Sequence, residues 1–118
     1  LVEDEPNVRR VVRQQLIDLG YPVIEAEDGQ QALAMVDQII DVAIVVSDII
    51  MPGGLNGRQL AEAVLDRRPA MRIVLMSGYT DETDTGEAGG ASDLPVLAKP
   101  FARQDLARAL QRAKREGA

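Results

Sequence analysis

The 118-residue sequence predicts a single α/β domain built on a parallel sheet with helices on both faces. Two observations lead to this prediction. Residues 42–46 are an unbroken apolar run of mostly β-branched residues, which is typical of a strand buried on both faces. Along the rest of the chain, strand-like segments alternate with segments whose apolar residues recur at helical spacing. This alternation favours right-handed crossovers between parallel strands.

The first half of the chain is expected to form two strands and two helices. Residues 1–4 are interpreted as the end of a strand whose beginning is absent, so we expect the sequence to come from a longer chain. A helix is predicted over residues 6–20, a second strand over 21–26 with Pro22 marking it as an edge, and a second helix from about residue 29 to 40. The helix residues expected to face the core are Val8, Val11, Val12, Leu16, Leu19, Ala32, Leu33, Val36, Ile39 and Ile40.

The second half continues the alternation. The third strand ends at Asp48, and a glycine-rich loop leads to a helix that begins at Asn56 or Gly57 and ends before Pro69. A fourth strand, residues 73–76, is followed by Ser77, and a fifth, residues 95–98, is followed by Lys99. Between them, residues 80–93 are expected to form a short, mobile fourth helix. The final helix, residues 102–115, should bury Leu106, Leu110 and Ala113.

Five strands suit the doubly wound, flavodoxin-like strand order 2-1-3-4-5, in which the first and third strands are neighbours. Ligands bind at the carboxyl ends of such strands. We therefore expect Glu3, Asp4 and Asp48 to converge there, with Ser77 and Lys99 supplied by the next two strands. Singly, these residues have ordinary interpretations, such as a helix cap or a loop start; their positions at successive strand ends favour a common site.

Three carboxylates within about 4–5 Å would repel one another by several kcal/mol per pair at an effective dielectric near 20. Mg²⁺ (or Mn²⁺) offsets this repulsion naturally, since these are hard cations that prefer oxygen ligands. A carboxylate beside Mg²⁺, a lysine and a hydroxyl is what phosphoryl transfer to an aspartate requires. Asp48 is the expected nucleophile, with Glu3 and Asp4 holding the metal.

The composition narrows the function further. The formal charge of −6 and the absence of a basic stripe argue against nucleic-acid binding by this domain. The sequence has no histidine and no cysteine, which removes the usual general base, the commonest transition-metal ligand and any disulfide. It also has no apolar run of membrane-spanning length and no signal-peptide pattern, so we expect a cytoplasmic domain without membrane contact.

The chain resembles the receiver domain of two-component response regulators over its whole length, residues 1–118. The resemblance is carried by four motifs: Val2-Glu3-Asp4-Glu5-Pro6, Ser47-Asp48-Ile49-Ile50-Met51-Pro52, Leu75-Met76-Ser77-Gly78-Tyr79 and Ala98-Lys99-Pro100-Phe101. It implies that Asp48 is the phosphoacceptor, that Glu3, Asp4, Asp48 and the carbonyl of Ile50 bind Mg²⁺, that Ser77 is the switch hydroxyl and that Lys99 binds the phosphoryl group. It also implies a cis Lys99-Pro100 bond.

The sequence departs from the family pattern at two places near these motifs. The loop from Met51 to Gly57 has one residue more than the commonest form, as in receivers attached to hybrid sensor kinases. Val96 stands where the family often has Tyr or Phe, which leaves Tyr79 as the aromatic residue of the switch.

By this resemblance the partners are a histidine kinase or phosphotransfer protein, and possibly a tethered kinase or output domain. A receiver catalyses its own phosphotransfer and dephosphorylation without being a turnover enzyme. Two alternatives remain open. One is a Mg²⁺-dependent phosphohydrolase with an aspartyl nucleophile. The sequence argues against it because Ile50 occupies the position of the acid that would protonate the leaving group. The other is an interaction module that is not phosphorylated.

Overall fold

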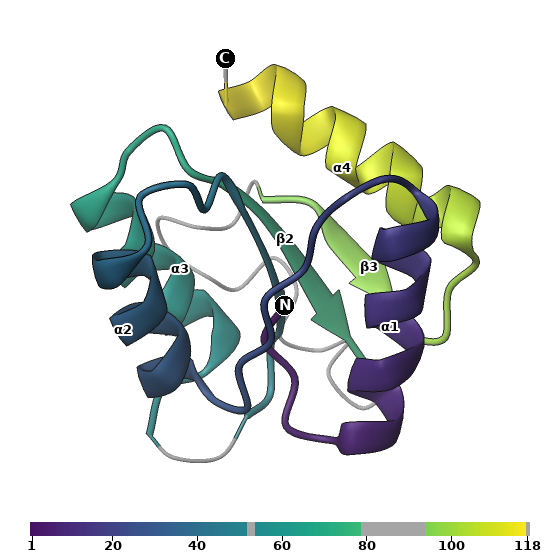
Figure 1. Ribbon diagram of the computed structural model, residues 1–118, viewed down its shortest axis with the longest axis horizontal. Coiled ribbons are helices and arrows are strands. Elements are labelled where there is room, and N and C mark those ends of the chain that lie inside the picture. Colours follow the sequence, from purple (N-terminus) through teal and green to yellow (C-terminus); the bar gives the residue numbers. More distant parts are fainter. Residues whose placement is uncertain (52–53, 79–93, 118) are drawn as a thin grey trace.

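The computed structural model describes residues 1–51, 54–78 and 94–117. Three parallel strands form the sheet: β1 (Ile44–Asp48), β2 (Arg72–Ser77) and β3 (Val96–Ala98), in the order β1-β2-β3. Asp48 pairs with Met76, and Ser77 pairs with Ala98, so the three strands end at the same edge. The arrowheads of β2 and β3 point to this edge in Figure 1.

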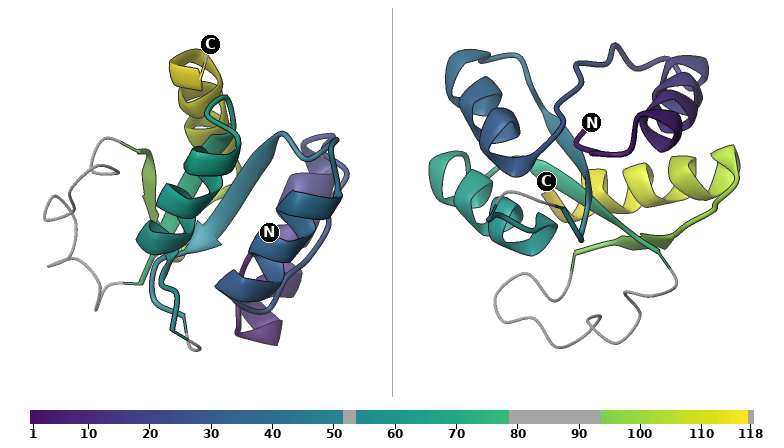
Figure 2. Two further views of the ribbon diagram at one scale, coloured as in Figure 1. Left: turned by 90° about the vertical axis from the view of Figure 1, so that its left-hand side faces the viewer. Right: turned by 90° about the horizontal axis from the view of Figure 1, so that it is seen from below.

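Four helices are described, and they cover both faces of the sheet (Figures 1 and 2). They are α1 (Pro6–Asp18), α2 (Gly29–Gln38), α3 (Gly57–Arg67) and α4 (Arg103–Gly117). Helices α2 and α3 lie together on one face, and α1 and α4 lie on the other. This arrangement confirms the predicted fold class of a parallel sheet between two helical layers.

The helices begin where the sequence places capping residues. The side chains of Glu5 and Asp28 accept hydrogen bonds from the first turns of α1 and α2. Asn56 forms a reciprocal capping box with Gln59 at the start of α3. Each cap satisfies a backbone N–H that has no partner within its own helix, which explains the agreement between predicted and observed starts.

The first two predicted strands are much shorter than expected. Val2 makes one parallel bridge to Ala26 and one to Ser47, and neither flanking segment forms a continuous strand. The backbone of residues 1–3 forms three hydrogen bonds with residues 24–26. An apolar cavity of about 460 Å³ lies next to Leu1, between residues 22–24 and 43–45. Residues 21–25 therefore lack the continuous ladder of backbone hydrogen bonds that a strand requires. The bridges nevertheless place Val2 between the second segment and β1.

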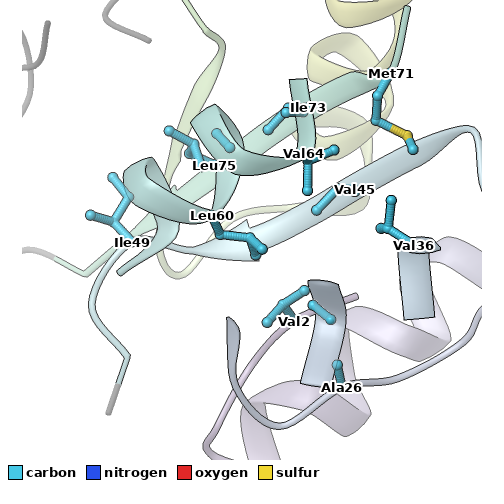
Figure 3. Close-up of a cluster of buried hydrophobic side chains, with 12 residues drawn as sticks. Val2, Ala26, Val36, Val45, Ile49, Leu60, Val64, Met71, Ile73 and Leu75 are labelled. Atoms are coloured by element: carbon cyan, nitrogen blue, oxygen red, sulfur yellow. The ribbon is translucent and has the colours of Figure 1, made fainter. Parts of the chain in front are cut away.

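Two hydrophobic clusters occupy the two faces of the sheet. The cluster beneath α2 and α3 includes Val36, Val45, Leu60, Val64 and Leu75 (Figure 3). The cluster beneath α1 and α4 contains the predicted Leu106, Leu110 and Ala113. The prediction was wrong for Val11 and Ile40, which are 58% and 85% exposed. Val11 lies outside the α1 stripe that contacts the sheet, and Ile40 follows the end of α2.

Arg68, immediately after α3, ties the end of α2 to the following loop. Its Nη1 donates to the carbonyls of Ile40 (3.1 Å) and Val42 (3.0 Å). Its Nη2 donates to those of Val36 (2.5 Å) and Ile39 (2.7 Å). A guanidinium at a helix C-terminus binds carbonyls that otherwise lack donors and complements the helix dipole.

We expect Arg68→Met to lower the free energy of unfolding by about 2–3 kcal/mol, because charge-assisted hydrogen bonds are the strong ones and their acceptors are partly buried. Arg67→Met is the matched control. Its ion pair with Asp37 (2.9 Å) is exposed, so the free energy of unfolding should fall by no more than about 1 kcal/mol. Urea denaturation of both variants measures the difference, and equal losses would contradict the role of Arg68.

Two expectations fall outside the described residues: the short helix over residues 80–93, and Tyr79. Among the residues that the structure describes, no helix is long and apolar enough to cross a membrane.

Candidate functional site

The candidate site lies where the strands end. Asp48 is the last residue of β1, Ser77 is the last residue of β2, and Lys99 follows β3. The N–H of Asp48 donates to the carbonyl of Val2 (3.0 Å), which brings Glu3 and Asp4 beside the end of β1. The N–H of Lys99 donates to the carbonyl of Ser77 (2.7 Å). Backbone hydrogen bonds of the sheet therefore bring four separate chain segments together.

Three carboxylates gather at this edge. Glu3, Asp4 and Asp48 each offer an oxygen, and these oxygens all lie within 4.8 Å of one another. Glu3 and Asp48 are buried, with exposed fractions of 1% and 5%, whereas Asp4 is exposed. The cluster thus combines two desolvated carboxylates with a third that faces water.

Lys99 supplies the positive charge of the cluster. Its Nζ lies 2.9 Å from Oδ1 of Asp48 and 3.2 Å from Oε1 of Glu3. The other oxygen of Glu3, Oε2, accepts a hydrogen bond from the N–H of Glu5 (3.1 Å). Both oxygens of Glu3 are therefore engaged within the protein.

The pKa values reflect this balance of charges. Burial raises the pKa of the Asp48 carboxyl to about 6; the nearby charges of Glu3 and Asp4 add to the rise, and Lys99 opposes it. Burial lowers the pKa of Lys99, but its hydrogen bond and charge interaction with Asp48, together with Glu3, outweigh that effect. The pKa of Lys99 is therefore raised, and Lys99 remains an ammonium group. One ammonium group does not balance three carboxylates, so the site favours a further cation.

The donor set fits a hard divalent cation such as Mg²⁺. The candidate side-chain ligands are all carboxylate oxygens, which Mg²⁺ prefers, and the exposed Asp4 leaves one side open to the waters that Mg²⁺ retains. Such a cation would also offset the repulsion from Glu3 and Asp4, which adds to the effect of burial on the pKa of Asp48. Ile50, whose carbonyl is a metal ligand only by the family resemblance, lies two residues after Asp48 and is half exposed.

The structure also describes three of the remaining predicted site residues. Ser77 is buried, Val96 is half-buried in β3, and the Lys99-Pro100 peptide bond is cis.

Three residues near the site were not singled out from the sequence. Arg9 donates from Nη1 to the carbonyl of Glu3 (2.8 Å) and pairs through Nε with Glu25 (3.2 Å). Ser47 and Gly57 contact the backbone of Asp48. Their positions next to Asp48 and at a helix start were visible in the sequence, but their contacts depend on the packing of α1 and α3 against the strand ends.

The structure has a parallel sheet between two helical layers, with an aspartate, two acidic neighbours, a buried hydroxyl and a lysine at its strand ends. This is the arrangement expected of a response regulator receiver domain. The family model described as response regulator receiver domain matches residues 1–111. The chain belongs to this family.

Relatives and solved structures agree with this assignment. The chain is 36% identical over 118 residues to the positive alginate biosynthesis regulatory protein of Pseudomonas aeruginosa, covering 98% of this chain and 46% of that protein. It is 33% identical over 108 residues to the sensor kinase CckA of Brucella abortus, covering 91% of this chain and 11% of that protein. The chain thus spans less than half of each.

A response regulator receiver domain protein from Clostridium thermocellum has the same fold. Its crystal structure superposes with a TM-score of 0.86 at 22% identity, covering 98% of this chain and 91% of that one.

Proposed function

We propose that Asp48 accepts a phosphoryl group from a phosphohistidine on a histidine kinase or phosphotransfer protein, within a receiver domain spanning residues 1–118. The observation that carries this proposal is the placement of Asp48. Its carboxylate is buried at the end of β1, 2.9 Å from the ammonium of Lys99 and within an acidic group suited to a divalent cation.

In the proposed reaction, a carboxylate oxygen of Asp48 attacks the phosphorus atom. The P–N bond to the histidine breaks, its electron pair stays on the imidazole nitrogen, and an acyl phosphate forms on Asp48. Lys99 binds an oxygen of the moving phosphoryl group, so its positive charge offsets the charge that develops there. The buried hydroxyl of Ser77 donates to another phosphoryl oxygen.

Glu3, Asp4, Asp48 and the carbonyl of Ile50 would hold Mg²⁺ or Mn²⁺, which supplies charge neutralisation to the phosphoryl oxygens. Lys99 already contacts both buried carboxylates, Glu3 and Asp48. This contact keeps the two carboxylates oriented together before a donor arrives.

Phosphorylation would change the affinity of the domain for a partner or for a tethered domain. The hydroxyl of Ser77 gains a charged acceptor when Asp48 carries a phosphoryl group, and such a hydrogen bond contributes about 1.5–3 kcal/mol. The relatives include both a sensor kinase and transcriptional regulators. We therefore include a tethered kinase or output domain among the proposed partners.

Intact-mass measurement after incubation with acetyl phosphate and Mg²⁺ tests the proposal. We expect the wild type to gain one phosphoryl group that hydroxylamine removes, because hydroxylamine cleaves acyl phosphates. Asp48→Asn should gain none, because the amide is not a nucleophile. Asp37→Asn, at an exposed ion pair with Arg67, is the control and should be labelled like the wild type.

The outcomes separate the alternatives. Equal labelling of the wild type and Asp48→Asn would exclude Asp48 as the acceptor. Absence of labelling from both acetyl phosphate and a kinase would favour the interaction module that is not phosphorylated. Sustained release of phosphate from phosphomonoesters over many turnovers would favour the phosphohydrolase.

A further inference from the structure

Gly57, the first residue of α3, is packed directly against the backbone that carries Asp48. Its N–H donates to the carbonyl of Ile49 (2.7 Å). A β-carbon at residue 57 would lie 2.8 Å from Cα of Ile49 and closer still to the carbonyl oxygen of Asp48. Since β-carbons essentially never come within 3.0 Å of such atoms, any side chain at residue 57 would have to push the Asp48-Ile49 peptide away.

Ser47 holds the same carbonyl by a hydrogen bond. Its hydroxyl Oγ donates to the carbonyl oxygen of Asp48 (2.9 Å), and the side chain is 1% exposed. The carbonyl oxygen of Asp48 therefore accepts a hydrogen bond from the buried hydroxyl of Ser47. It also packs against Gly57, which has no side chain. We call these two residues, Ser47 and Gly57, the Asp48 clamp.

We propose that the Asp48 clamp sets the position of the Asp48 carboxylate for phosphoryl transfer, an inference that rests on the proposed function. Only two bonds separate the Asp48 carbonyl carbon from the side-chain Cβ, so a shift of the clamped peptide moves the carboxylate with it. The carboxylate must stay within reach of Lys99 and in line with the bond that breaks. Misplacing a reacting group by about 1 Å lowers rates by about 100-fold. Ser47 and Gly57 thus act as positioning residues through the backbone of Asp48.

Gly29 provides a matched control. Like Gly57, it is a buried glycine at the first position of a helix, preceded by a capping residue. A β-carbon at residue 29 would lie 2.8 Å from Cβ of Leu55, so Gly29→Ala also displaces a neighbour, but the displaced residue is Leu55 and not the Asp48-Ile49 peptide. Both substitutions replace glycine by alanine at the first position of a helix, so any difference in helix propensity is shared. The main difference is which atoms must move: the Asp48-Ile49 peptide at residue 57 and Leu55 at residue 29.

The test compares the wild type, Gly57→Ala, Gly29→Ala and Ser47→Ala. For each, the rate of labelling by acetyl phosphate at saturating Mg²⁺ is measured over a range of acetyl phosphate concentrations, well below every melting temperature. We expect Gly57→Ala to lower the maximal rate by about 10- to 100-fold with little change in the half-saturating concentration. Gly29→Ala should stay within about two-fold of the wild type, and Ser47→Ala should show a smaller loss in the same direction as Gly57→Ala.

The ¹⁹F spectrum of the beryllofluoride adduct provides a readout that stability alone does not change. We expect the resonances of the bound fluorides to shift in Gly57→Ala and to match the wild type in Gly29→Ala. A folded Gly57→Ala variant with a wild-type maximal rate would overturn the proposal. If Gly57→Ala does not fold, the test rests on Ser47→Ala, which removes a hydroxyl and creates no clash. A wild-type labelling rate in Ser47→Ala would then overturn the proposal. Absence of labelling in the wild type would instead reject the proposed function itself.

Discussion

Lys99→Met should lower the rate of Asp48 phosphorylation by about 10²- to 10³-fold at saturating Mg²⁺. Lys99 is the ammonium group in contact with Asp48, at 2.9 Å, and its side chain is only 20% exposed. Removing one positioned donor to developing charge costs a factor of this size in other enzymes. Methionine keeps the length and apolar stem of lysine, so the change isolates the lost charge. The rate of mass gain with acetyl phosphate measures the effect.

Two control variants sharpen this result. Arg103→Met removes one positive charge from an exposed ion pair with Asp18 and should leave the rate within about two-fold of the wild type. Lys99→Arg keeps the charge but replaces a compact ammonium with a planar guanidinium, so we expect an intermediate rate. A Lys99→Met variant labelled as fast as Arg103→Met would show that Lys99 does not assist the transfer.

The same substitution should also affect stability. Without a metal, Lys99→Met leaves the buried carboxylates of Glu3 and Asp48 without their ammonium partner, and we expect a loss of about 1–3 kcal/mol at pH 7. The loss should shrink near pH 4, where Asp48 is protonated in the folded state. Urea denaturation at the two pH values measures this dependence.

In the wild type without metal, the contribution of Asp48 to the free energy of unfolding should fall as the pH rises from about 4 to about 6. The pKa of Asp48 is raised from an ordinary 3.8 to about 6 in the folded protein, so the folded state binds this proton more tightly than the unfolded chain. Protonated Asp48 makes its full contribution to the free energy of unfolding below pH 3.8, and this contribution is lost as the pH rises through about 6. A pKa shift of this size corresponds to a change of roughly 3 kcal/mol in the free energy of unfolding. Asp48→Asn should lack this pH dependence and be more stable than the wild type at pH 7.

Mg²⁺ should reverse much of this loss, because it binds the folded carboxylate cluster and not the unfolded chain. At ten times its dissociation constant, which we expect to be millimolar, a ligand stabilises by about 1.4 kcal/mol. Asp4→Asn should abolish the increase in melting temperature, whereas Asp37→Asn, at an exposed ion pair, should preserve it. A wild-type melting temperature that is the same with and without Mg²⁺ would contradict the metal site.

The sequence by itself predicted the fold class and the places where the candidate site residues lie. The apolar run before Asp48 indicated a buried strand, and Asn56 indicated a helix start because capping is a local interaction. Parallel strands end on the same side of a sheet. The predicted parallel sheet therefore places Glu3, Asp48 and Lys99 at one edge. These inferences depend on spacing along the chain, which the sequence contains in full.

Only the tertiary structure revealed how the residues around these positions act. Arg68 reaches four carbonyls in and after α2, Gly57 packs against the peptide of Asp48, and Val11 faces solvent although its spacing indicated the core. Each of these depends on how one helix is rotated and how closely it approaches another segment, which no local pattern encodes. The raised pKa of Asp48 has the same origin, because desolvation depends on everything packed around the carboxylate.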